Sequence, residues 1–213
     1  MAATTRLSAV VAAIDAANAD DPRKLVVDGE EIAFEQLYSQ RMSARLAAVY
    51  PGASELLQIA ARAQHLRRWE IHRADYPQGR HGYNDWRKQC RIHHAKQVGD
   101  IMRAQGYSDD EANHVGALIR KEQLKKDRES QALENIAAIV FLEHYFDEFL
   151  AKYEGYDDDK IVDILGKTLC KMSPRGHAAA LELPLPPRTR ALVTAAIEKE
   201  SAALSRLAAV AVD

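Results

Sequence analysis

Apolar residues recur at spacings of three and four along most of the chain, which is the period of a helix that buries one face. We find no segment with a convincing alternation of apolar and polar residues, as a half-buried strand would require. The pattern therefore predicts an all-α fold, a single compact domain of eight or nine helices spanning residues 1–213.

Capping residues and helix breakers set the expected ends of these helices. Ser54 is an N-cap, Ser108 with Glu111 has the spacing of a capping box, and Gly106 is a suitable C-terminal residue. Ser173 precedes a proline and opens a short helix. The expected helices span about residues 4–18, 34–49, 54–69, 82–105, 129–153, 157–172 and 189–211, with others opening at 108 and 174. The segment "KLVV" at 24–27 is expected to be a short extended piece.

The longest apolar run, "IAAIVFL" at 136–142, lies in the expected helix 129–153. That helix is apolar almost all round, which is typical of a helix at the centre of a fold. Seven apolar residues are too few to cross a bilayer.

Composition narrows the class of protein. The chain has 213 residues, of which 47% are hydrophobic and 28% charged, and a net charge of −2. These values are typical of a globular protein and do not favour general affinity for nucleic acid or anionic membranes. Two cysteines, Cys90 and Cys170, give no disulfide framework. We therefore expect a soluble protein of the reduced cytoplasm.

The net charge conceals a basic segment. Residues 62–91 carry eight Lys or Arg against three acids, which is +5 in a chain that is −7 elsewhere. Both tryptophans lie there, and a cation beside an aromatic ring suits a phosphate or carboxylate next to a flat ring. The alternative is a solvated face whose arginines pair with acids such as Glu35 or Glu134. The residues expected to bind an anionic substrate are Arg62, Arg68, Trp69, Tyr76, Arg80, Tyr83, Trp86, Arg87 and Lys121.

Three further residues suggest a metal centre. His65 lies on the same expected helical face as Arg62, His94 shares a face with Arg87, and Glu134 precedes the apolar run. Two imidazoles and a carboxylate would suit one divalent transition metal, Zn, Fe or Mn, with positions open for water or substrate. His65, His94 and Glu134 are therefore candidate metal ligands and catalytic residues. The alternative is a hydrogen-bonded network of the same three residues without a metal.

Several stretches carry a family resemblance. They include "EQLYSQRMSARL", "ELLQIAARAQHLRRWEIHRADYPQGRHGYNDWR", "HHAKQVGDIMRAQGY" and "ALENIAAIVFLEHYF". Over nearly its whole length the chain resembles the family catalogued as domain of unknown function 4202, which brings no established activity.

A more distant similarity involves HD-type metal-dependent phosphohydrolases, from His94 to the segment "ALENIAAIVF". This resemblance implies a degenerate HD-like helical core in which His65 matches the first histidine and His94 a later one. The chain departs from that pattern, because it has no His-Asp pair and because Lys121 and Glu134-Asn135 replace an expected histidine and aspartate.

Three functions follow as hypotheses. The first is a divergent HD-like enzyme, a metal-dependent hydrolase acting on a small anionic, phosphorylated substrate. The second is a metal-free binding or regulatory protein for a nucleotide-like or other anionic ligand. The third and weakest is RNA binding through the basic aromatic segment. We expect neither a membrane nor general nucleic acid as a partner, and self-association could use the C-terminal Ala-rich helix.

Overall fold

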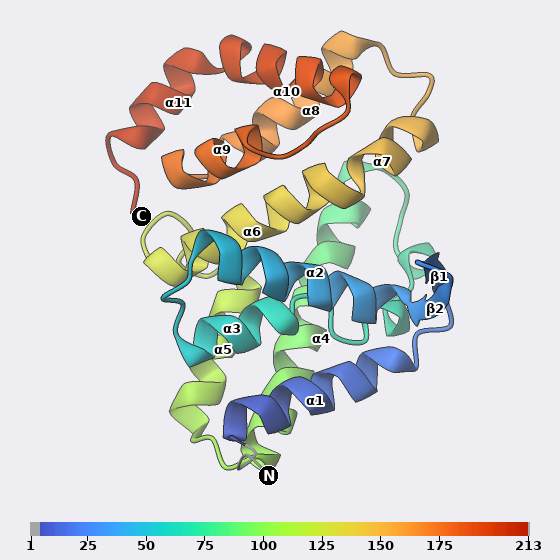
Figure 1. Ribbon diagram of the computed structural model, residues 1–213, viewed down its shortest axis with the longest axis vertical. Helices are drawn as coiled ribbons and strands as arrows, with labels where there is room; N and C mark the ends of the chain where they lie inside the picture. Colours follow the sequence, from blue (N-terminus) through green and yellow to red (C-terminus); the bar gives the residue numbers. More distant parts are fainter. Residues whose placement is uncertain (1–4, 213) are drawn as a thin grey trace. The chain divides into compact units, whose positions relative to one another are not determined.

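The computed structural model describes residues 5–212. These residues are mostly helical, as the periodicity predicts, with eleven α-helices, two short 3-10 helices and one β-hairpin (Figure 1). The expected number of eight or nine helices was too low. The contacts divide the chain into two units, unit 1 up to residue 122 and unit 2 from residue 123.

Unit 1 carries the hairpin and five α-helices among its described residues. The helix α4 packs along α5, and α3 contacts both α2 and α5. Apolar side chains from each helix are fully buried, among them Ile14, Met42, Ile59, Val98 and Ile119. The elements are α1 (Arg6–Ala19), β1 (Lys24–Val27), β2 (Glu30–Ala33), α2 (Phe34–Val49), α3 (Glu55–Arg62), η1 (Arg68–Glu70), η2 (Arg73–Asp75), α4 (Gly79–Ala104) and α5 (Asp109–Arg120).

The hairpin is the element that periodicity missed. The strands β1 and β2 pair antiparallel, with Val27 opposite Glu30. The two turn residues, Asp28 and Gly29, both have positive φ, 52° and 85°. Such a two-residue turn favours Asp-Gly and joins twisted strands closely. The extended piece expected at 24–27 is thus confirmed, and its partner strand lies between it and α2.

Local capping explains several helix ends. The Ser54 hydroxyl accepts a hydrogen bond from the Leu57 backbone N–H at 3.1 Å, and Ser108 and Glu111 form the expected capping box. The helix expected at 54–69 is shorter than predicted, because α3 ends at Arg62 and Arg67 adopts a left-handed conformation with φ of 51°. His65 and Trp69 therefore follow the end of α3 and do not lie on its surface.

Unit 2 contains the remaining helices. The helix α8 packs on α10, and α6 on α9 (Figure 1). Ile136, Ile139, Phe146, Ile161 and Val193 are among its fully buried residues. The elements are α6 (Arg128–His144), α7 (Phe146–Lys152), α8 (Asp158–Leu169), α9 (Pro174–Leu181), α10 (Pro187–Lys199) and α11 (Ser201–Ala208).

Two expected long helices are each divided. The helix expected at 129–153 breaks at Tyr145, whose ψ of −5° and φ of −130° are not helical, into α6 and α7. The helix expected at 189–211 is α10 followed by α11, with the break at Glu200. Neither break contains Pro or Gly, so helix propensity did not predict them. The apolar run 136–142 lies within α6, whose residues from Ser130 to Leu142 are buried except Ala137 and Phe141. No helix in the described residues is both long and apolar enough to span a bilayer.

Candidate anion site

Two arginines of the basic segment lie against a pair of aromatic rings in unit 1. The guanidinium carbon of Arg68, at the start of η1, lies 4.5 Å from the centroid of the Trp86 ring. The guanidinium carbon of Arg87 lies 5.8 Å from the centroid of Tyr83. The two rings are 5.7 Å apart, and both come from α4. We call this group of Arg68, Arg87, Tyr83 and Trp86 the Arg68–Arg87 site.

The loop that carries Arg68 is fixed to α4 by a hydrogen bond. The indole Nε1–H of Trp86 donates to the backbone carbonyl of Ile71 at 2.9 Å. Because Ile71 immediately follows η1, this bond holds the start of the loop close to the ring on which Arg68 lies. The geometry therefore does not depend on the cation–aromatic contacts alone.

Neither arginine of the site has a carboxylate partner. Within residues 5–122, the guanidinium groups of Arg68 and Arg87 form no hydrogen bond or ion pair, although both side chains are half-buried. Most other arginines of the unit are paired, for example Arg67 with Glu70 and Arg103 with Asp109. A half-buried cation without a partner has lost part of its hydration without compensation.

The His65 imidazole lies within the electrostatic influence of these cations. Nδ1 of His65 is 3.1 Å from Oε2 of Glu35, and the ring stacks on Tyr38 with centroids 3.8 Å apart. Oε1 of Glu35 accepts a hydrogen bond from Arg23 at 2.7 Å. Because a carboxylate held in this way accepts hydrogen bonds, Nδ1 of His65 carries the proton and Nε2 has the lone pair.

His94 provides a second oriented imidazole. Its Nδ1 lies 2.8 Å from the backbone carbonyl oxygen of Leu66, so this nitrogen also carries the proton. His94 is 1% exposed, and its Nε2 is a buried atom without a hydrogen-bond partner in the described part of the chain. The rings of His65 and His94 are 6.0 Å apart between centroids. We call these two residues the imidazole pair.

The surroundings keep the imidazole pair uncharged. Burial lowers the pKa of His65 well below its ordinary value, and the positive charges of Arg68, Arg87, Lys121 and Arg23 lower it further. Burial likewise lowers the pKa of His94, and His65 and Arg68 add to this effect.

Glu35 is the buried carboxylate of this region. Burial raises its pKa, while the hydrogen bond from Arg23 and the charge of Arg68 act in the opposite direction. The guanidinium of Arg23 also binds Asp21, at 3.0 Å. Glu35 is therefore hydrogen-bonded to Arg23 and His65, and its negative charge also acts on Arg68.

The structure separates other candidate residues from this site. Arg62 forms two hydrogen bonds to Asp15, of 2.7 and 2.6 Å, and its side chain is 11% exposed. Such a closely paired arginine stabilises the contact between α1 and α3. The guanidinium group of Arg62 is therefore engaged with Asp15 and is a weaker candidate for binding an anion. Arg80 lies exposed in the first turn of α4. Trp69 contacts Arg67, and the carbonyl oxygen of Tyr76 accepts a hydrogen bond from Arg73. The role of Arg80, Trp69 and Tyr76 in binding an anion stays a prediction.

The three candidate metal ligands belong to different units. His65 and His94 come together in unit 1, whereas Glu134 lies in α6 of unit 2, where it is 7% exposed. Among residues 5–212, no group of three or more His, Cys, Asp and Glu side chains has an arrangement that could hold a metal ion. The structure places the two histidine rings 6.0 Å apart, and the role of all three residues as metal ligands stays a prediction.

Asn135, next to Glu134, has a role in the fold of unit 2. Its side-chain amide donates to Ser173 Oγ at 2.8 Å and accepts from the Ser173 backbone N–H at 3.0 Å. It also accepts a hydrogen bond from Gln131. These bonds attach the start of α9 to α6, which explains a buried asparagine without any ligand.

Sequence reasoning missed Tyr38, Arg23 and Asp21, and it named Glu35 only as a partner for arginines. The fully buried Glu35 lies in the first turn of α2, where the helix dipole stabilises an acidic side chain. Its partner His65 is 30 residues away in the chain, so no local pattern predicted this contact.

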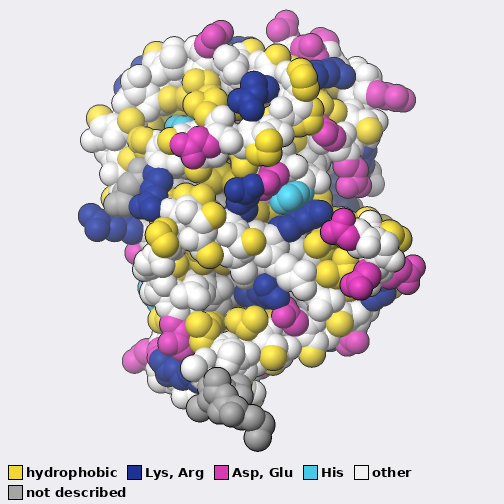
Figure 2. Space-filling model, in the orientation of Figure 1, with side chains coloured by type: hydrophobic (Ala, Val, Ile, Leu, Met, Phe, Trp, Pro, Cys, Tyr) yellow, Lys and Arg dark blue, Asp and Glu magenta, His cyan; other side chains and the backbone are white. Residues whose placement is uncertain are grey.

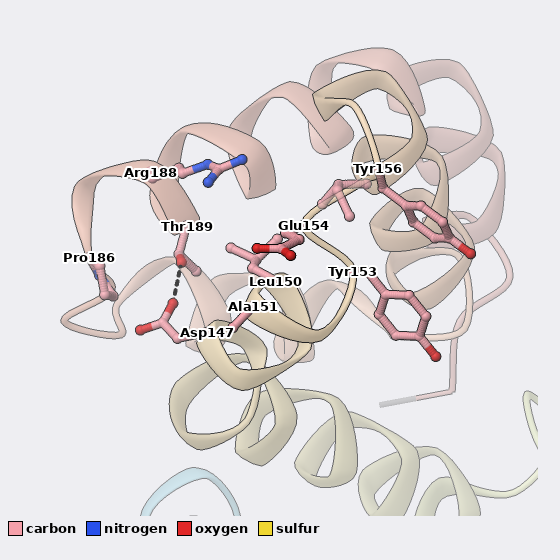
Figure 3. A pocket seen from close by; sticks show the side chains of 10 residues that line it. Asp147, Leu150, Ala151, Tyr153, Glu154, Tyr156, Pro186, Arg188 and Thr189 are labelled. Carbon is pink, nitrogen blue, oxygen red and sulfur yellow. Dashed lines mark hydrogen bonds between the residues drawn. The ribbon is translucent and has the colours of Figure 1, made fainter.

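Unit 2 has a pocket of its own. A cavity of about 380 Å³ is lined by side chains of α7, α10 and the loop after α7, including Tyr153, Glu154 and Arg188 (Figure 3). Two of the charged groups at its edge, Asp147 and Arg188, have partners. Asp147 accepts a hydrogen bond from Thr189 at 2.9 Å, as the dashed line shows, and Arg188 pairs with Asp158 at 3.0 Å. We therefore regard the Arg68–Arg87 site as the stronger candidate.

Comparisons with known proteins give a family without an activity. Neither the search of curated proteins nor the search of solved structures found a match. The family described as Domain of unknown function (DUF4202) matches residues 8–193, which include the Arg68–Arg87 site and the imidazole pair. The chain therefore belongs to the DUF4202 family.

Proposed function

We propose that unit 1 binds a small anionic ligand between Arg68 and Arg87, next to His65. One observation carries the proposal. Arg68 and Arg87 are half-buried against the neighbouring rings of Trp86 and Tyr83, and neither guanidinium group has a carboxylate partner among the described residues of unit 1. An oxyanion would supply the missing charge, and guanidinium groups bind phosphate and carboxylate oxygens in a directed geometry.

The electrostatic setting supports an anion. The charges of Arg68, Arg87, Lys121 and Arg23 all act on His65, and Arg23 forms ion pairs with Asp21 and Glu35. Arg68 and Arg87 carry positive charge that no ion pair within the described part of unit 1 offsets. A ligand that brings negative charge would be stabilised in this half-buried place more than in water.

A small ligand is favoured over a nucleic acid. The net charge of the chain is −2. On the face of the molecule drawn in Figure 2, acidic and basic side chains are interspersed. Nucleic acids bind to extended basic surfaces that neutralise several phosphates. RNA binding therefore stays the weakest of the three hypotheses.

Anion binding can be measured with the protein's own fluorescence. We suggest titrating Trp69→Phe protein, in which Trp86 is the remaining tryptophan, with phosphate, pyrophosphate, mononucleotides and dicarboxylates at low salt. Arg68→Gln and Arg87→Gln should each weaken binding at least about tenfold, because a hydrogen bond to a charged group contributes about 1.5–3 kcal/mol.

Lys88→Gln provides the matched control. Lys88 follows Arg87 on α4, is exposed, and loses the same charge on substitution. It should leave the affinity within about twofold, since an exposed charge is largely screened. Equal losses in Arg87→Gln and Lys88→Gln would indicate general attraction, and the absence of binding by any anion at millimolar concentration would refute the proposal.

A metal-dependent hydrolase is the second candidate function. The specific observation in its favour is that both members of the imidazole pair have Nδ1 engaged and Nε2 available, as in histidines that bind metals. In this hypothesis a metal held by the imidazole pair would supply an activated water. The cations around His65 fit such an ion poorly, because like charges repel.

Elemental analysis of protein expressed with added Zn, Fe and Mn separates the two candidates. Anion binding without a metal predicts that a chelator leaves the affinity for phosphate unchanged. The hydrolase would instead be favoured if the unmodified protein holds about one equivalent of metal and if His65→Asn and His94→Asn hold none. Self-association through α10 and α11 is an independent expectation, and sedimentation of the intact protein tests it.

A further inference from the structure

The imidazole pair points to a chemical property of the ligand. Each ring has its Nδ1 proton directed to an oxygen of the protein, Glu35 Oε2 for His65 and the Leu66 carbonyl for His94. The remaining ring nitrogens are then acceptors. The region of the Arg68–Arg87 site thus offers two kinds of group, guanidinium donors and imidazole acceptors.

The acceptor of His94 is buried and unused, as are Nε2 of the neighbouring His93 and two other side-chain atoms of the described residues. The Nε2 atom of His94 has no partner in the described residues, and the residue is 1% exposed. An unpaired buried polar atom costs about 1–3 kcal/mol relative to a paired one. The neighbouring imidazole cannot relieve this cost, since Nε2 of His65 is also an acceptor.

A fully ionised oxyanion would not satisfy these acceptors. Sulfate has four oxygens that accept hydrogen bonds and no proton to donate, so its approach would place lone pairs against the lone pairs of the imidazole pair. Hydrogen phosphate has the same charge of −2, a similar size and one P–OH donor. Arg68 and Arg87 can bind the ionised oxygens of either anion, and the imidazole pair distinguishes them.

We propose that the Arg68–Arg87 site selects oxyanions that carry their own proton, of the hydrogen phosphate class, and that the imidazole pair accepts this proton in a hydrogen bond. His65, at 22% side-chain exposure, is the acceptor closer to solvent, and the buried His94 lies behind it. The inference rests on the proposed anion site and adds to it a requirement for a donor.

The requirement follows from the asymmetry of hydrogen-bond selection. A site built to pair with a hydroxyl group rejects an analogue without it strongly, because the polar groups of the site are left unpaired. We therefore expect phosphate to bind at least about tenfold more tightly than sulfate.

Four anions test the requirement on the unmodified protein. Phosphate and arsenate carry a proton near pH 8, whereas sulfate and selenate do not, and all four are dianions of similar shape. The imidazole pair is uncharged at that pH, because both pKa values are lowered. Tight binding of phosphate and arsenate together with weak binding of sulfate and selenate is the expected result.

Asparagine substitutions identify the acceptor. The amide of Asn can occupy the place of the Nδ1–H donor while Nε2 is removed, so His65→Asn keeps a donor for Glu35 and His94→Asn one for Leu66. The ratio of phosphate to sulfate affinity should fall toward one in one or both variants. His81→Asn is the matched control, because the His81 side chain is exposed and its Nδ1 lies 2.9 Å from Asp85, and in this variant the ratio should be unchanged.

The outcomes separate this inference from the proposed function. If none of the four anions binds, the anion site itself is refuted. If all four bind with similar affinity, the anion site stands and the donor requirement is wrong. A preference for phosphate that persists in His65→Asn, His94→Asn and the double variant would refute the assignment of the imidazole pair. Since the comparison of the four anions needs no substitution, a variant that fails to fold does not prevent a decision.

Discussion

Nδ1 of His65 lies 3.1 Å from Oε2 of Glu35, a carboxylate with a side chain that is only 1% exposed. This contact fixes which ring nitrogen of the histidine carries the proton. The other carboxylate oxygen of Glu35 accepts a hydrogen bond from Arg23, so both oxygens of this carboxylate already have partners. The site next to this contact is consequently cationic and has an imidazole acceptor at its edge.

The charge of Arg87 should be detectable at His65. Because the positive charge of Arg87 lowers the pKa of His65, Arg87→Gln is expected to raise that pKa. The measurement is an NMR titration of the imidazole protons. Lys88→Gln, which removes the same charge from an exposed position, should produce a smaller change. Identical shifts in the two variants would mean that Arg87 is not beside His65.

Arg62 and Arg87 should differ sharply in their effect on stability. Arg62→Gln removes two hydrogen bonds to Asp15 and leaves a mostly buried carboxylate unpaired, so we expect a loss of about 1.5–3 kcal/mol in the free energy of unfolding. Arg87→Gln breaks no ion pair within the described part of unit 1 and should change the free energy of unfolding by less than about 1 kcal/mol.

Urea denaturation followed by tryptophan fluorescence measures both effects, since Trp69 and Trp86 lie in unit 1. A loss in Arg87→Gln as large as that in Arg62→Gln would show that Arg87 has a structural role. The proposed ligand site would then lose its main support.

The apolar segment of α6 provides a test of the fold of unit 2. Leu142 is 3% exposed, and Leu142→Ala should cost about 2–5 kcal/mol, because it removes buried methyl groups and leaves a cavity. Leu181→Ala in α9 is the matched control, since Leu181 is 44% exposed and should lose less than about 1 kcal/mol. Denaturation followed by circular dichroism would measure both, and equal losses would show that α6 is placed wrongly.

Features that depend on neighbouring residues could be predicted from the sequence. The caps at Ser54 and Ser108 are where the pattern places them, because each forms bonds within four residues. The hairpin had an equally local signal, since Asp28-Gly29 favours a two-residue turn, and it was overlooked because its strands are only four residues long. The break after α3 had no such signal, because Arg67 adopts a positive φ without being Gly or Asn.

The candidate site was predicted less completely, because its contacts are not local. The cluster of charge and aromatic rings at 62–91 located Arg68, Arg87, Tyr83 and Trp86 correctly in one region. Which arginines are free for a ligand depends on distant acids, and Asp15, 47 residues from Arg62, could not be identified as its partner from periodicity. For the same reason periodicity indicated His65 as a candidate residue but did not predict its contact with Glu35.

The imidazole pair also predicts how stability responds to acid. The pKa of each histidine is lower in the folded protein than its ordinary value of about 6.5, so above about pH 7.5 both are uncharged in the folded and the unfolded chain. As the pH falls through about 6.5, the unfolded chain binds protons that the folded protein excludes. The free energy of unfolding should therefore decrease, by at most about 1.4 kcal/mol per pH unit for each histidine.

Glu35 acts in the opposite direction, and the two effects can be separated. Because burial raises the pKa of Glu35, the folded protein takes up that proton more readily than the unfolded chain, which reduces the loss of stability at low pH. Urea denaturation between about pH 8 and pH 5.5 should show the loss due to the histidines, and His94→Asn should reduce its slope by about half. His81→Asn is the control, because His81 is exposed and its substitution leaves both members of the imidazole pair in place. A slope that His94→Asn does not alter would show that His94 is not the buried, uncharged imidazole on which the selection of protonated oxyanions depends.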